Sequence, residues 1–114
     1  MGIDADLEYC YLTTTGRVSG EPREIEIWFG LRGSTVYLLS GGGERSDWVR
    51  NLLVEPRVTL RLGGEAYRGT ARVVRDADED RMARSLVHGK YASGPGDIAR
   101  WRDESVVVAI DLEA

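Results

Sequence analysis

Residues 13–23 read TTTGRVSGEPR and lie between two segments with strand character. The stretch holds four hydroxyl side chains, two glycines and two arginines, Arg17 and Arg23. Glycines let backbone N–H groups approach an anion closely, and arginine and serine side chains add further donors. It therefore has two interpretations, a polar hairpin turn or a phosphate-binding turn, and composition alone favours the simple turn.

The segments around this stretch predict a mainly β protein. Alternating or β-branched residues predict six strands, at 7–14, 23–31, 34–40, 57–62, 65–75 and 104–112. Two helices are expected, from Ser46 or Asp47 up to Pro56 and over 78–91, the second opened by Asp76 or Asp78. The order βββαββαβ, with hairpin-like spacing, predicts a six-stranded antiparallel barrel with two outer helices. We expect one domain over residues 1–114.

Charge and composition exclude several functions. The net charge of −4 argues against nucleic acid as a partner. Cys10 and His88 are each the only residue of their type, so a zinc site built from several Cys or His is excluded, and we expect no metal. The N-terminus lacks the pattern of a signal peptide, and no apolar run approaches the roughly 18 residues of a membrane span. We therefore expect a cytoplasmic protein.

Three further segments are candidates for ligand contact. Ser40, Gly41 and Gly42 end a strand just before a helix, where backbone N–H groups can meet a phosphate or a flat ring. Trp48 and Asn51 lie on that helix, although Trp48 is most simply a core residue. A pocket further along the chain could be lined by His88, Tyr91 and Trp101. No catalytic triad is visible, so an enzyme of this sequence would rely on a cofactor.

Taken together, the motifs resemble the flavin/deazaflavin oxidoreductase superfamily, which has the split β-barrel fold of pyridoxamine-phosphate oxidases. The closer likeness is to its deazaflavin (F420)-dependent nitroreductase, or F420H2-dependent quinone reductase, branch. That branch carries L-T-T-T-G-R-x-S-G-x-P-R, matched at 12–23, and W-x-x-N-L-x-x-x-P, matched at 48–56. An aromatic-bearing strand at 27–29 and a strand ending in Ser40 before a Gly-rich loop lie between them. The agreement runs from about residue 11 to residue 75.

The resemblance implies an oxidoreductase in which reduced F420 gives a hydride to a quinone, an enone or a nitro compound. It implies that Arg17, Arg23 and Ser19 hold the phosphate and acidic tail of the cofactor, and that Trp28 lies beside the ring. Further cofactor contacts are expected at Ser40, Gly41, Gly42, Trp48 and Asn51. Tyr91 is the candidate to stabilise or protonate the developing anion.

Two departures from the branch leave alternatives open. Val18 and Gly41 stand where the family often has lysine, so two cationic contacts to an acidic cofactor are absent. The alternatives are an FMN-binding oxidoreductase of the same fold, a carrier that binds a flavin-like ligand without turnover, and a barrel with no ligand. Split barrels of this kind often pair, so we also expect a homodimer. The region after residue 76 matches poorly, and the sequence does not identify the substrate.

Overall fold

One antiparallel sheet of seven strands dominates the computed structural model, which describes residues 3–92 and 98–113. The strands are β1 (Cys10–Thr15), β2 (Pro22–Ile27), β3 (Gly30–Arg32), β4 (Thr35–Ser40), β5 (Arg57–Leu62), β6 (Glu65–Val73) and β7 (Val106–Leu112). Gly63 and Gly64 both adopt positive φ in the turn between β5 and β6, as their place between two alternating segments predicts.

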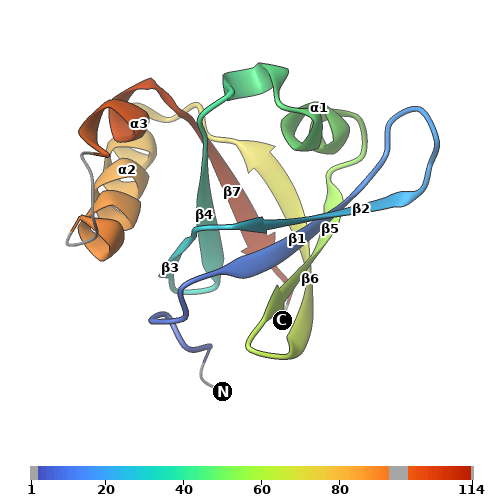
Figure 1. Cartoon of the computed structure of the whole chain (residues 1–114), viewed down its shortest axis with the longest axis horizontal. Helices are drawn as coiled ribbons and strands as arrows, with labels where there is room; N and C mark the ends of the chain where they lie inside the picture. The colour runs from blue at the N-terminus through green and yellow to red at the C-terminus, as the bar shows by residue number, and fades with distance from the viewer. Residues whose placement is uncertain (1–2, 93–97, 114) are drawn as a thin grey trace.

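The strand order closes the sheet on itself. Its order is β2-β1-β5-β6-β7-β4-β3, so the two edge strands are β2 and β3. These strands are consecutive in the chain and are joined only by Trp28 and Phe29. A two-residue connection cannot span a flat seven-stranded sheet, so the sheet must curl until its edges approach (Figure 1). This is the split β-barrel class that the sequence predicts.

The number of strands differs from the prediction of six. The segment 23–31, expected as one strand, is divided at Trp28 and Phe29 into β2 and β3. The alternation of β2 ends at Ile27, after which Phe29 and Gly30 are both buried. The chain leaves one edge of the sheet here and joins the other, a tertiary constraint that local alternation does not encode.

The helices lie in two places. Helix α1 (Asp47–Val54), preceded by the short 3-10 helix η1 (Gly43–Arg45), contacts β1 and β6 and covers one end of the barrel. Helix α2 (Ala77–Tyr91) packs with α3 (Ala99–Glu104) on the side formed by β3, β4 and β7 (Figure 1). The side chain of Asp76 caps α2 by accepting a hydrogen bond from Glu79 N at 2.8 Å. Helix α3 was not predicted, because six residues without a side-chain cap carry little local signal.

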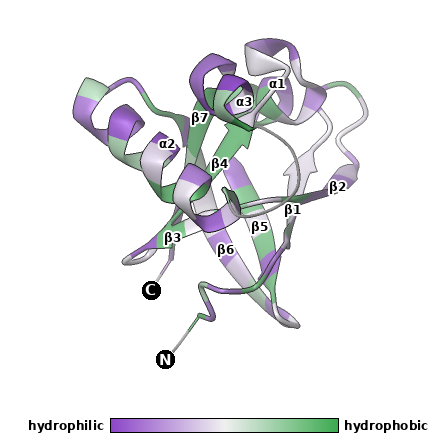
Figure 2. Ribbon diagram, turned by 60° about the vertical axis from the view of Figure 1, so that its left-hand side comes forward, coloured by the Kyte–Doolittle hydropathy of each residue, from purple (hydrophilic) through white to green (hydrophobic). Residues whose placement is uncertain are grey.

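Two apolar clusters form the core. The larger lies inside the barrel and includes Cys10, Leu12 and Phe29, all fully buried. The smaller joins α2 and α3 to the outer face of β4 and β7. Because β4 and β7 are thus covered on both faces, they are almost uniformly hydrophobic, whereas α2 is mostly hydrophilic in colour (Figure 2). The outer face of β2, β5 and β6 is largely exposed and polar, and the outward residues of β1 are half-buried.

Candidate cofactor site

The stretch TTTGRVSGEPR, residues 13–23, contains the end of β1 and a tight turn. Gly16 N donates to Glu21 O and Gly20 N donates to Gly16 O, both at 2.8 Å. Gly20 has a φ of +73°, which side-chain-bearing residues rarely adopt. A Cβ at Gly16 would lie 2.7 Å from Ser19 Oγ, so both glycines are needed for this conformation.

Asn51 on α1 fixes the turn to the helix. Its Oδ1 accepts hydrogen bonds from Arg17 Nη1 at 2.8 Å and from Arg17 N at 3.2 Å. Its Nδ2 donates to Thr14 Oγ1 at 3.2 Å. Asn51 and Thr14 are 4% and 1% exposed, so these bonds are largely shielded from water. Arg17 Nη2 also pairs with the exposed Asp47 at 3.1 Å, and the guanidinium is thereby held against α1.

A hollow of about 520 Å³ opens between this turn, β2 and α1. We call it the cofactor hollow. It brings together five of the residues predicted from sequence to contact a cofactor: Arg17, Ser19, Arg23, Trp48 and Asn51. Its other lining residues are Thr14, Gly16, Val18, Ile25 and Asp47. The turn and α1, which are about 30 residues apart in the chain, therefore form one surface. This surface is apolar along Ile25 and Trp48 and cationic at the turn.

The donors of this hollow suit an anionic group. Arg23 has a half-exposed side chain, and its contacts within the described residues 3–92 and 98–113 are a 3.4 Å hydrogen bond to Ser19 Oγ and a 3.9 Å contact with Glu21. Its guanidinium can therefore turn toward a ligand at little cost, whereas Arg17 is already oriented. Two guanidinium groups and a serine hydroxyl are what phosphate recognition requires. Asp47 reduces the net positive charge, and Val18, which is 95% exposed, adds none.

An aromatic cluster lies where β2 passes into β3. The rings of Trp28 and Tyr91 are stacked, with centroids 4.2 Å apart and planes within 3° of parallel. Trp101 from α3 meets Trp28 edge-on, with centroids 5.6 Å apart. A Cβ at Gly41 would lie 3.3 Å from Trp101 Cδ1, so this indole occupies the space beside the glycine loop. Four predicted residues, far apart in sequence, thus meet here.

The hydroxyl of Tyr91 is engaged with the backbone. It accepts from Phe29 N at 3.1 Å and lies 2.7 Å from Glu8 O and 3.2 Å from Phe29 O, to which it can donate. Burial raises the pKa of this phenol to about 12. Beside it, Lys90 Nζ donates to Phe29 O at 3.1 Å and lies 3.5 Å above the Phe29 ring. These contacts hold the corner that presents Trp28.

The glycine loop after β4 is held by its own serines. Ser40 Oγ donates to Gly43 O at 2.9 Å and lies 2.8 Å from Ser46 Oγ, so the Ser40 side chain faces the loop and not the hollow. A Cβ at Gly42 would collide with Ser46 Oγ. Only the backbone groups of Ser40, Gly41 and Gly42 remain as candidates for ligand contact. His88, also considered from sequence, is half-buried on α2.

Two residues important to this geometry were missed from sequence. Asp47 was considered only as a helix cap, yet its carboxylate pairs with Arg17. Ile25 was expected to be a half-buried strand residue, and its side chain forms part of the hollow wall. The alternation of residues 23–27 predicts which face of β2 carries Ile25. It does not predict that α1 lies opposite this face, because that placement depends on the curl of the sheet.

Comparison with known structures supports the fold. The chain is 18% identical to an F420-H2 dependent reductase, with a TM-score of 0.74 over 90% of this chain and 93% of that one. It is 17% identical to a Listeria innocua protein provisionally named a pyridoxamine 5′-phosphate oxidase (TM-score 0.71; 95% and 86% covered). A structure described as a domain-swapped dimer is 20% identical (TM-score 0.74; 90% and 79% covered). These likenesses place the chain among the pyridoxamine-phosphate-oxidase-like split barrels.

The particular family follows from the sequence model that matches the chain. Residues 4–113 match the model of the F420H(2)-dependent quinone reductases. The chain therefore belongs to that family, it is an F420-dependent reductase, and its cofactor is F420. Within residues 3–92 and 98–113, no helix is both long enough and apolar enough to span a membrane.

Proposed function

We propose that this protein reduces an electron-poor small molecule, a quinone in the first place and an enone or nitro compound as further candidates, at the expense of reduced F420. The observation that carries the proposal is the cofactor hollow, which combines two arginines with an apolar wall beside the barrel edge. The reaction class comes from the family, and the choice among acceptors is our own expectation.

The geometry supports a cofactor lying along β2. Arg23 lies near the start of this strand and Trp28 just beyond its end. Five residues of extended chain span about 17 Å. An elongated cofactor can therefore have its phosphate at Arg17, Arg23 and Ser19 and its ring near Trp28. Asn51 keeps Arg17 oriented in this arrangement, and Ile25 and Trp48 exclude water between the two ends.

When bound, reduced F420 supplies the hydride that the acceptor takes up. The chain contributes orientation: Trp28, held by its stack with Tyr91, would limit the tilt of a flat ring beside it. Backbone N–H groups at Ser40 and Gly41 would be donors to a polar ring edge. We retain Tyr91 as the candidate proton donor, although its engaged hydroxyl and raised pKa favour the alternative that it acts by positioning Trp28.

The proposal is tested by following oxidation of F420H2 through its absorbance, with a quinone, an enone and a nitroaromatic as acceptors. Arg23→Gln should raise the KM for F420H2 several-fold, because one phosphate contact is lost. Arg32→Gln, an exposed arginine on β3 outside the hollow, is the matched control and should leave KM unchanged. Failure of the wild type to oxidise F420H2 with any acceptor would overturn the proposal.

Three expectations from sequence stay predictions. A homodimer is supported by the structural relative described as a domain-swapped dimer, and sedimentation velocity would test it. Sedimentation as a monomer at micromolar concentration would contradict it. The cytoplasmic location and the single domain over residues 1–114 likewise stay predictions.

A further inference from the structure

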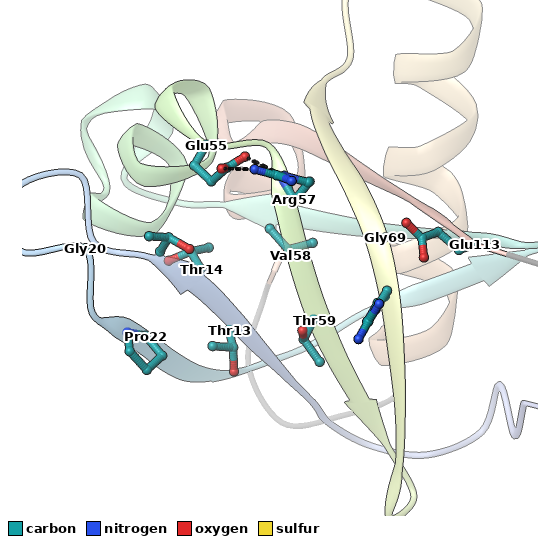
Figure 3. Close-up of a pocket in the computed structure, with 12 residues that line it drawn as sticks. Thr13, Thr14, Gly20, Pro22, Glu55, Arg57, Val58, Thr59, Gly69 and Glu113 are labelled. Atoms are coloured by element: carbon teal, nitrogen blue, oxygen red, sulfur yellow. Dashed lines mark hydrogen bonds and ion pairs between the residues drawn. The ribbon is translucent and has the colours of Figure 1, made fainter.

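A second hollow, of about 590 Å³, lies beside β1, β5 and β6, and its charges balance (Figure 3). Its charged lining residues are two carboxylates and two guanidinium groups: Glu55, Glu113, Arg57 and Arg68. Arg57 Nη2 and Glu55 Oε1 are paired at 2.8 Å. This hollow therefore selects neither an anion nor a cation, whereas the aromatic cluster offers a more specific contact.

The pyrrole edge of the Trp101 indole lies against the glycine loop. A Cβ placed on Gly41 would be 3.3 Å from Trp101 Cδ1 and 3.6 Å from Trp101 Nε1, which are adjacent atoms of the pyrrole ring. The edge that carries the N–H is therefore at the loop whose backbone groups are candidates for ligand contact. Trp101 also meets Trp28, so its N–H is beside the position proposed for the cofactor ring.

The indole N–H of Trp101 is an unengaged donor. Within residues 3–92 and 98–113, Trp101 Nε1 forms no hydrogen bond. Every buried side-chain nitrogen or oxygen of this part of the chain has a partner, so an N–H without one must be open to solvent, and a ligand can reach it. The Trp28 N–H is likewise unengaged among these residues, and it is the competing donor of the cluster.

Trp101 is fixed by the elements on both sides of α3. Ser105, which is 3% exposed and precedes β7, donates to Trp101 O through its backbone N at 3.1 Å and through its Oγ. Arg84 on α2 donates through Nη1 to Arg102 O. The indole packs against the apolar cluster on the outer face of β4 and β7. A donor that is oriented in advance is most effective toward charge that develops during a reaction.

The indole approaches the ring position from the α3 side. The cofactor hollow is lined by the turn, β2 and α1, and Trp101 is not among its lining residues. A cofactor lying along β2 therefore leaves the space at Trp101 to the acceptor. The Tyr91 hydroxyl, another donor of the cluster, is already engaged with the backbone of Phe29 and Glu8.

We propose that the Trp101 indole N–H donates a hydrogen bond to the oxygen of the acceptor and stabilises the negative charge that develops there. The inference rests on the proposed function, since it concerns the acceptor of the same reaction. A quinone that takes up a hydride from reduced F420 becomes a hydroquinone anion with its charge on oxygen, and one proton from water completes the hydroquinone. The contact favours acceptors that carry a carbonyl or nitro oxygen.

The test compares two acceptors of F420H2 oxidation, a soluble naphthoquinone and methylene blue. Methylene blue is a flat cation without a carbonyl oxygen, and uptake of a hydride neutralises its charge. Trp101→Phe should lower kcat/KM for the naphthoquinone about 5- to 10-fold relative to methylene blue, the size of one neutral hydrogen bond. The smaller ring affects both acceptors, so the ratio isolates the N–H. The KM for F420H2 should stay unchanged.

Calorimetric titration of the protein loaded with oxidised F420 gives a readout without turnover. Trp101→Phe should weaken binding of the naphthoquinone less than it lowers kcat/KM, because the ground-state carbonyl carries less charge than the developing anion. Arg100→Gln is the control on the same helix, since its side chain is 85% exposed and pairs with Glu104. It should change neither the ratio nor the binding.

The outcomes separate the two proposals. If wild type reduces neither acceptor, the proposed function fails. If Trp101→Phe lowers kcat/KM for both acceptors alike or for neither, or raises the KM for F420H2, the inference is overturned. A selective loss in Trp28→Phe or Tyr91→Phe, and not in Trp101→Phe, would overturn it too. Loss of folded protein lowers both rates in proportion, so it cannot imitate or hide a change in their ratio.

Discussion

Replacement of Asn51 by alanine tests the link between the helix and the phosphate-binding turn. The change removes the acceptor of two Arg17 hydrogen bonds and the donor to Thr14 Oγ1. A neutral buried bond contributes about 1 kcal/mol and a charge-assisted one about 1.5–3 kcal/mol. The lower end applies to Arg17, because its side chain is 25% exposed and can recover water. We expect the free energy of unfolding to fall by about 2–3 kcal/mol.

The measurement is urea unfolding followed by tryptophan fluorescence, with the m-value compared between variants. Asp47→Ala is the matched control, because it removes the other Arg17 partner, whose side chain is 83% exposed. That change should cost less than about 1 kcal/mol. The reasoning is refuted if Asn51→Ala lies within about 0.5 kcal/mol of wild type, or if the control is equally destabilising.

Three further predictions concern the aromatic cluster, the turn and the outer helix. Tyr91→Phe should keep most of kcat and leave the pH profile of kcat unchanged, because the stack on Trp28 survives. A large loss of kcat would instead support proton donation by the phenol. Val18→Lys should tighten F420 binding up to about 5-fold with unchanged stability, because the position is 95% exposed and adjoins the two arginines; equal or weaker binding in the titration would contradict this. Glu79→Gln should destabilise most at neutral pH, because Arg72 lowers the pKa of this carboxylate, so its contribution is present above the unfolded pKa of about 4.3 and is lost as pH falls through the lower folded value. Urea unfolding at several pH values would show a constant difference between the two proteins if that reasoning is wrong.

A network of hydrogen bonds around Arg72 links α2 to the sheet. Arg72 donates two 2.8 Å hydrogen bonds to Glu79 and a 2.7 Å one to Asp111. Tyr37 donates to Glu79 at 2.7 Å, and burial together with this bond raises its pKa to about 12. Helix α2 is thereby tied to β4, β6 and β7. Since α2 ends at Tyr91, the network indirectly positions the aromatic cluster.

Local pattern predicted most of the fold. The alternation of residues 57–62 and 65–75 predicted two strands joined at Gly63-Gly64, and the structure has β5 over Arg57–Leu62 and β6 over Glu65–Val73, because each side chain's burial follows its place in the pleat. The break at Trp28 and Phe29 was not predictable in this way, because it exists only to carry the chain between the two edges of the curled sheet. Helix α3 depends on the packing of Trp101 and has no local signal of its own.

The candidate site was predictable in composition but not in full geometry. The motifs brought Arg17, Ser19 and Asn51 into one group, and they do line one hollow. The burial of the Ser40 hydroxyl within its own loop was not foreseen, since it depends on Ser46 across that loop.

The central claim is that the hollow beside TTTGRVSGEPR binds F420, and the most direct test is a fluorescence titration of the purified protein with F420 and, separately, with FMN. The account predicts micromolar or tighter binding of F420 and much weaker binding of FMN. Preference for FMN, or binding of neither, would contradict it.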